Sequence, residues 1–194
     1  MVNLHGESWT PAELNVPTFG ADPALNGGII ATRNLITARQ GIFLAVGCSD
    51  HKSAGSIGLD KRNLEGVDIV HDVEVLPWPL PDACAYRILM SHIVEHLDPA
   101  KIVDIIDECW RIMKPQGQLL IAMPYAGSPR FWQDPTHKHA WNEATATYFD
   151  CMQPLWQVYR PQCWKIELNE WQSIGDIQVI LSKRKGAHGS HDTP

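Results

Sequence analysis

The sequence lacks several motifs that would assign a function directly. It has no G-x-S-x-G nucleophile motif, and the absence of G-x-G-x-x-G argues against a dinucleotide enzyme. Its five cysteines are odd in number and contain no C-x-x-C pair, so we predict neither a disulfide framework nor a zinc knuckle. This cysteine usage favours a reducing compartment, and we expect a cytoplasmic protein. No apolar run approaches ~18 residues, so we expect no membrane-spanning helix and no membrane partner.

Positive charge is also scarce. The 194 residues include 16 Lys and Arg against 22 Asp and Glu, which gives a formal net charge of −6 at pH 7. This balance argues against a broad surface for bulk nucleic acid. The length suits one domain with a sizeable core.

Short apolar runs recur along the chain and predict strands. The expected strands are residues 42–46, 56–60, 67–70, 86–90 and 118–123, followed by two closing strands at 164–168 and 176–181. A helix is predicted after Asp98, with Asp98 as its cap, Pro99 in its first turn and 115–117 as its stop. A short helix is expected over 142–149.

This alternation predicts a doubly wound, mostly parallel α/β sheet with an antiparallel hairpin at the C-terminal end. We place the α/β domain at residues 41–182. Residues 1–40 read as an N-terminal arm with a short helix near 32–39, and residues 183–194 as a disordered tail.

Ligands of such sheets bind outside the carboxyl ends of the strands. Gly47 follows the first strand, where the lack of a Cβ lets backbone amides approach a ligand closely. Asp60 ends the second strand, where an acid can bind two ribose hydroxyls. Together they predict a nucleoside pocket.

The order of motifs resembles that of the class I S-adenosylmethionine-dependent methyltransferases over about residues 41–150. The pieces that carry the resemblance are residues 46–48 (Val-Gly-Cys), 58–60 (Gly-Leu-Asp), 72–78, 91–97 and 109–117. The resemblance implies a Rossmann-like methyltransferase fold, S-adenosylmethionine as cofactor and a methyltransferase activity.

It also implies roles for single residues. Gly47 and Cys48 would contact the methionine part of the cofactor through their backbone, and Asp60 would bind the ribose. Asp72 would accept from the adenine amino group, with the Val73 backbone beside it.

Ser91 and His92 would flank the methyl group and the substrate. Trp78 is open to two interpretations, since it either covers the adenine face or packs beneath the loop.

The sequence departs from the family's pattern in its first loop. Gly-Cys-Ser at 47–49 replaces Gly-x-Gly, no acid ends the first strand, and Asp60 comes only 13 positions after Gly47. That span leaves room for little or no helix. A second hypothesis therefore stays open: an inactive methyltransferase-like domain that acts as a binding or scaffold subunit.

Methyl transfer from a sulfonium needs positioning, and an oxygen or nitrogen nucleophile also needs a base. Candidate bases occur in residues 92–96 and in 134–139, the loop region where this family builds its acceptor pocket. We expect His137, His139 and His92 to be catalytic, with a small-molecule or saccharide acceptor. These segments contain enough ligand types for a metal, but the His137/His139 spacing is not H-E-x-x-H, so we predict no metal.

Overall fold

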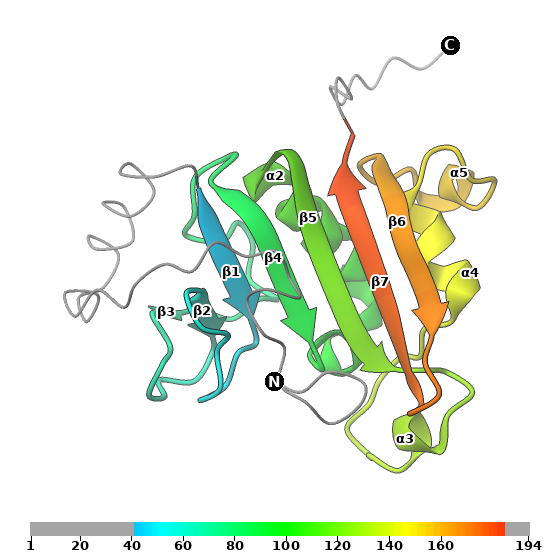
Figure 1. Cartoon of the computed structure of the whole chain (residues 1–194), viewed down its shortest axis with the longest axis horizontal. Helices are drawn as coiled ribbons and strands as arrows, with labels where there is room; N and C mark the ends of the chain where they lie inside the picture. The colour runs from blue at the N-terminus through cyan, green and yellow to red at the C-terminus, as the bar shows by residue number, and fades with distance from the viewer. Residues whose placement is uncertain (1–40, 185–194) are drawn as a thin grey trace.

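The computed structural model describes residues 41–184, and they form a seven-stranded sheet of order β3-β2-β1-β4-β5-β7-β6 (Figure 1). The five neighbouring strands β3, β2, β1, β4 and β5 are parallel, and β7 runs antiparallel to both β5 and β6. This confirms the mostly parallel α/β sheet and its closing antiparallel hairpin. The strands are β1 Ile42–Val46, β2 Ile57–Asp60, β3 Ile69–Val70, β4 Ala85–Ser91, β5 Met113–Pro124, β6 Trp164–Trp171 and β7 Asp176–Lys183. The N-terminal arm, including the helix expected near 32–39, lies outside the described residues, as does 185–194.

The longest helix among the described residues is α2, which connects β4 to β5. The helical segments are η2 Val94–His96, η3 Pro99–Lys101, α2 Ile102–Ile112, α3 Pro129–Trp132, α4 Glu143–Ala146, η4 Thr147–Phe149 and α5 Trp156–Tyr159. The Asp98 side chain accepts from the Ala100 amide and caps η3, as predicted. Residues 47–56, between β1 and β2, contain no helix, which confirms the short crossover. No helix in the described part of the chain is long and apolar enough to span a bilayer.

The predicted stop of the long helix is wrong in one respect. The chain passes from α2 directly into β5 at Met113, so residues 115–117 lie within the bounds of the strand. They form a bulge there, since Ala85 pairs with Met113, Arg87 pairs with Gln118 and Gln116 has φ +67°. Gly117 permits this because a Cβ there would lie 2.3 Å from the Met113 sulfur. The turn signal of residues 115–117 therefore appears as a bulge near the start of β5, after the helix has ended at Ile112.

The core lies between the sheet and α2. Ile105, Ile106 and Ile112 of α2 pack against one face of the strands, and Phe149 of η4 joins the same cluster. The stripe at helical spacing therefore buries the face that the sequence predicts. On the opposite face, Phe43, Leu89 and Leu120 form a smaller cluster of strand side chains; successive strand residues point to opposite faces.

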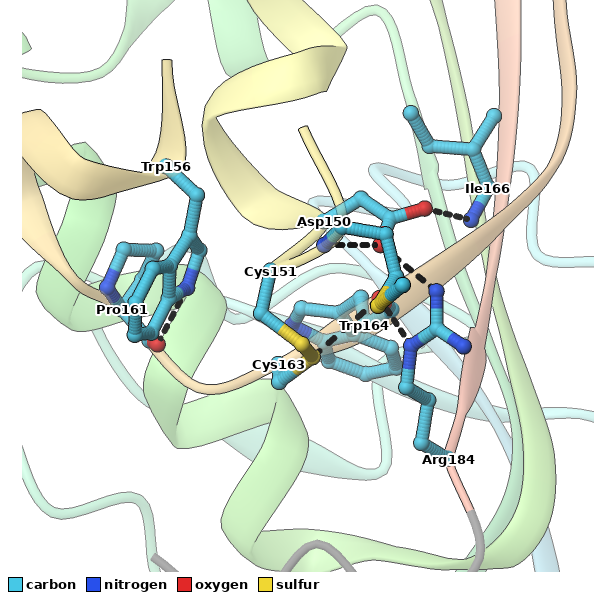
Figure 2. The surroundings of a disulfide bond; sticks show 9 residues. Asp150, Cys151, Trp156, Pro161, Cys163, Trp164, Ile166 and Arg184 are labelled. Atoms are coloured by element: carbon cyan, nitrogen blue, oxygen red, sulfur yellow. Dashed lines mark hydrogen bonds and ion pairs between the residues drawn. A yellow bond between two sulfur atoms is a disulfide. The ribbon is translucent and has the colours of Figure 1, made fainter. Parts of the chain in front are cut away.

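A disulfide joins Cys151, after η4, to Cys163, just before β6, with a Cα–Cα distance of 5.0 Å (Figure 2). Asp150 beside it accepts from the Ile166 amide at 3.3 Å and from Arg184 Nη2 at 2.6 Å. The two cysteines are 12 residues apart in no recognisable motif, so the sequence did not indicate their pairing. Disulfides are typical of oxidising compartments, so this bridge does not support the cytoplasmic location expected from cysteine usage.

The C-terminal boundary lies slightly beyond the predicted one. Lys183 is the last residue of β7, and its Nζ donates to the carbonyls of Trp110 and Met113, each at 2.8 Å. Arg184 donates to the Trp164 carbonyl at 3.1 Å. These two residues, assigned above to the tail, therefore contact the domain.

We expect reduction of the disulfide to lower the free energy of unfolding by about 2–3 kcal/mol, because the closed loop restricts the unfolded chain. Urea unfolding with and without a thiol reductant measures this difference. The Cys151→Ser/Cys163→Ser variant is the control, and reductant should leave its midpoint unchanged. Equal midpoints for the unaltered protein in both conditions would contradict the expectation.

Candidate functional site

The carboxyl ends of the parallel strands lie together along one side of the sheet (Figure 1). Val46, the last residue of β1, is in register with Leu59 of β2 and Met90 of β4. Asp60 is in register with Val70, the last residue of β3. The loops that follow β1 to β4 therefore leave the sheet side by side. The residues predicted to bind the cofactor lie in the loops after β1 and β3 and at the last positions of β2 and β4.

The turn after β1 requires glycine at its first position. Gly47 has φ +64°, and its amide donates to the Leu59 carbonyl at 2.7 Å. A Cβ on Gly47 would lie 2.6 Å from Cγ1 of Ile93, which follows β4. Cys48 is buried, with its sulfur 2.7 Å from where a Gly58 Cβ would stand, and burial raises the pKa of its thiol. Cys48 is therefore a packed side chain beside the turn.

Asp60 links the turns after β1 and β2. The residue is 5% exposed; Oδ2 accepts from the Ser49 amide at 2.9 Å, and Oδ1 accepts from the Arg62 amide at 2.9 Å. Burial acts to raise the pKa of this carboxyl, but the hydrogen bonds from Arg62 and Ser49 outweigh it, and the pKa lies below its usual value. Asp60 is therefore an anion at neutral pH. The Arg62 side chain that covers it is 56% exposed, so it has room to move aside.

The turn after β3 lies next to Asp60. The His71 amide donates to the Asp60 carbonyl at 2.9 Å, and Asp72 Oδ1 accepts from the amide two residues ahead at 2.9 Å. Trp78 is buried, and its indole N–H donates to the Val73 carbonyl at 3.0 Å. Of the two interpretations of Trp78, packing beneath the loop is therefore the one that the structure shows.

A cluster of histidines and acids follows β4. His92 has φ +51°, and its amide donates to the Ala122 carbonyl of β5 at 2.8 Å. His92 Nδ1 lies 3.3 Å from Glu95 Oε1, and its Nε2 lies 3.6 Å from Asp176 Oδ2. The hydrogen bond with Glu95 raises the pKa of His92 above its usual value against the opposing effect of burial.

The loop after α3 folds back onto this cluster. The Lys138 amide donates to the Glu95 carbonyl at 2.7 Å, and the rings of His96 and His137 lie 4.8 Å apart. Thr136 Oγ1 lies 3.0 Å from His96 Nδ1. The two polar segments, about forty residues apart in sequence, are thus one cluster in space.

The three predicted catalytic histidines differ in access. His92 has a side chain 44% exposed, whereas that of His137 is 7% exposed. His139 accepts from the Trp141 indole N–H at 3.2 Å through Nδ1, and burial lowers its pKa. Its Nε2 is buried, and an interaction of the ring with the Val94 backbone opposes the effect of burial on its pKa. The neutral, inward-facing ring of His139 supports the loop, and His92 is the most accessible of the three.

Two groups among residues 41–184 bring potential metal ligands together. Glu95, His96 and His137 each offer one ligand atom, all within 4.8 Å of one another. The second group is Asp150 with Cys151 and Cys163, but its sulfurs form the disulfide. Only the first group therefore has free ligand atoms.

Sequence reasoning missed Asp176, a buried acid at the start of β7. Its Oδ1 lies 3.4 Å from Arg130 Nε, and its Oδ2 faces His92. The signal in the sequence was an acid at the first position of an apolar strand. Because β7 is antiparallel to β5, the start of β7 lies beside the carboxyl end of β5.

We expect Gly47→Ala to lower the free energy of unfolding by roughly 2–4 kcal/mol, from the left-handed backbone and overpacking against Ile93 together. Gly66→Ala is the matched control: Gly66 has φ +88° but no atom within 3.4 Å of the added Cβ, so a loss of about 1 kcal/mol is expected. In an Ile93→Ala background the Gly47→Ala loss should become smaller but stay above the control value, because Cγ1 and Cδ1 are removed while the Cβ of residue 93 remains 2.9 Å from the added Cβ. Equal losses for the two glycine variants would show that Ile93 does not restrict this turn.

In metal-free buffer we expect His92 to titrate above, and His139 below, the usual histidine pKa of about 6.5. Because the folded pKa of His92 is raised, its pairing with Glu95 stabilises the fold at low pH. That stabilisation is lost as the pH rises through the raised value. NMR titration of the ring protons measures both pKa values, and Glu95→Gln should lower that of His92. An unchanged His92 pKa in that variant would contradict the assignment.

No protein-family model matches the sequence, and a comparison with curated proteins finds no match. Solved structures do match. An S-adenosylmethionine-dependent methyltransferase from Archaeoglobus fulgidus has a TM-score of 0.54 at 21% identity, over 79% of this chain and 92% of that one. The 1,6-didemethyltoxoflavin-N1-methyltransferase of Burkholderia thailandensis, with 1,6-didemethyltoxoflavin and S-adenosylhomocysteine bound, has a TM-score of 0.55 at 11% identity, over 79% of this chain and 76% of that one.

A third similar structure is the 16S rRNA (adenine(1408)-N(1))-methyltransferase of Catenulisporales acidiphilia, with a TM-score of 0.54 at 11% identity, over 80% of this chain and 91% of that one. The names of the last two proteins give different acceptors, 1,6-didemethyltoxoflavin and 16S rRNA, so the likeness concerns the scaffold. This chain has the Rossmann-like fold of the S-adenosylmethionine-dependent methyltransferases.

Proposed function

We propose that the protein transfers a methyl group from S-adenosylmethionine to an oxygen or nitrogen atom of a small-molecule or saccharide acceptor. Asp60 is the observation that carries this proposal. A buried, ionised carboxylate at the end of β2 is hydrogen-bonded to the turn after β1, so the ribose-binding acid and the glycine turn form one unit. A fold alone does not define an activity, whereas a positioned acid in this place supports one.

The order of the strands supports the same proposal. Across the sheet β3, β2, β1 and β4 are consecutive. Asp72 after β3 would accept from the adenine amino group, Asp60 after β2 would bind the ribose, and Gly47 after β1 would contact the methionine part. Ser91 at the end of β4 would lie by the methyl group. Three of these positions would thus follow the cofactor from its adenine to its methionine part, and the fourth would lie beside its methyl group.

The acceptor would bind beyond β4, on the β5 side. His92 is the accessible base there, between the carboxylates of Glu95 and Asp176. Trp132 and Trp171 are exposed, and Trp171 lies 6.1 Å from the Tyr125 ring. Flat aromatic faces of this kind stack on sugar and heterocyclic rings. The net charge of −6 favours a small acceptor over a polyanion.

Two contacts favour the alternative, a binding subunit without turnover. Arg62 and the Ser49 amide already occupy both oxygens of Asp60, and Ile93 fills the space beside Gly47. Cofactor binding would require Arg62 to share the carboxylate. Failure of that rearrangement would leave the scaffold with no methyl donor.

Calorimetric titration with S-adenosylmethionine and S-adenosylhomocysteine tests the proposal. We expect micromolar binding of both, weakened at least tenfold by Asp60→Ala because the ribose hydroxyls lose their acceptor. Glu65→Ala, which removes an exposed carboxylate from the loop after β2, is the matched control and should bind normally. Equal binding by the Asp60 and Glu65 variants would refute the pocket assignment. No binding at millimolar cofactor would favour the binding-subunit alternative.

A further inference from the structure

We infer that Glu95, His96 and His137 form a binding site for a divalent transition-metal ion, with zinc as the reference ion. This inference goes beyond the proposed function and does not depend on it, because an ion can bind here whether or not a methyl group is transferred. It also departs from the sequence-based expectation of no metal.

The three residues supply a suitable set of ligands. Glu95 and His96 come from η2, and His137 comes from the loop after α3, with ligand atoms within 4.8 Å of one another. Two imidazole nitrogens and one carboxylate oxygen are a set that zinc accepts, and three protein ligands leave a coordination position open. Imidazole also suits other first-row divalent ions, so the ligand class is a transition metal and not magnesium or calcium.

The hydrogen bonds of His96 prepare its ring for coordination. The Thr136 hydroxyl donates to Asp134 Oδ1 at 2.7 Å, so its oxygen is left to accept from His96 Nδ1 at 3.0 Å. This network assigns the ring proton to Nδ1. Nε2 of His96 therefore keeps a free electron pair.

His137 is prepared in the same way. Its Nδ1 lies 2.7 Å from the Phe131 carbonyl, which can only accept, so the proton is on Nδ1 and Nε2 keeps its electron pair. Metal-ligating histidines almost always donate their other ring N–H to a carbonyl, carboxylate or water, and the partner fixes ring orientation. Asp134 Oδ2, 3.8 Å from His137 Nε2, is a further oxygen at the side of the cluster.

A second observation that indicates a cation is the unpartnered side-chain oxygen of Glu95. Glu95 is 1% exposed, and its Oε2 has no hydrogen-bond partner among the described residues, although Oε1 faces His92 at 3.3 Å. Burial of a carboxylate oxygen without a partner is strongly unfavourable, and a bound cation removes that penalty. The Lys138 amide, which donates to the Glu95 carbonyl, holds the His137 loop against this oxygen.

The position of the site indicates what a bound ion would do. The cluster follows β4 directly after Ser91, on the side where the proposed acceptor would bind. A divalent ion with an open position polarises an oxygen ligand and lowers its pKa. It would also crosslink η2 to the loop after α3.

Zinc titration of the full-length protein, treated with chelator and dialysed, tests the site. His5, His188 and His191 lie outside the described residues and are changed to Gln in every sample, so that they add no background binding. We expect one zinc ion per chain with micromolar or tighter affinity, and cobalt(II) should give the visible absorption of a four-coordinate site. Glu95→Gln and His137→Gln should each weaken zinc binding about 100-fold. His51→Gln, at an exposed histidine after β1, is the matched control.

A second pair of variants covers the case in which the ligand variants fail to fold. Thr136 is exposed, so neither Thr136→Val nor Thr136→Ser should move the metal-free unfolding midpoint. Thr136→Val removes the hydrogen bond to His96 and should weaken zinc binding about 10-fold to 100-fold, whereas Thr136→Ser keeps the hydroxyl and should bind normally.

Two results would overturn the inference: the absence of one-to-one zinc binding by the starting protein, or equal zinc binding by it, Glu95→Gln, His137→Gln and Thr136→Val. The cofactor titration with Asp60→Ala is carried out with chelator present. Failure of the metal site and failure of the proposed function are therefore separate results.

Discussion

The packing of α2 on one face of the sheet is the interaction on which the rest of the domain depends. Its buried isoleucines cover the central strands, and its polar residues hold the surrounding loops. Glu108 accepts from the Trp78 amide at 2.7 Å and pairs with Arg111 at 2.6 Å. Asp107 accepts from the Gln162 amide at 2.8 Å, and its pKa is raised to about 6 by burial. A single helix thus fixes both the loop between β3 and β4 and the entry to β6.

Asp60 and Glu95, two of the buried acids of the site, differ in their hydrogen-bond partners. Asp60 has hydrogen-bond donors on both oxygens, from Ser49 and Arg62, and so is stable as an anion without a ligand. Glu95 faces His92 through one oxygen, and the other lacks a partner within the described chain. The first arrangement suits exchange of one hydrogen-bond donor for another, as ribose binding requires. In the second arrangement His92 pairs with one oxygen and the other has no donor, which is why we propose a cation as a ligand of that oxygen.

Most of the elements could be predicted from the sequence because their signals are local. Apolar runs marked the strands, and the cap at Asp98 with the isoleucine stripe marked the long helix. The start of β5 at Met113 could not be read in this way, since the Pro-Gln-Gly signal of residues 115–117 is typical of a turn. The disulfide between Cys151 and Cys163 could not be predicted either, because the two cysteines come together only when the chain folds.

The sequence by itself determined the order of the strands along the chain, the residues at their ends and the resemblance of those ends to a cofactor-binding pattern. Only the tertiary structure decided that the 92–96 and 134–139 segments meet around Glu95, that Asp176 joins them from β7, and that Trp78 lies beneath its loop. The physical reason is the range of the interactions. Periodicity and capping act over a few residues, whereas hydrogen-bond partners and burial depend on how distant segments pack.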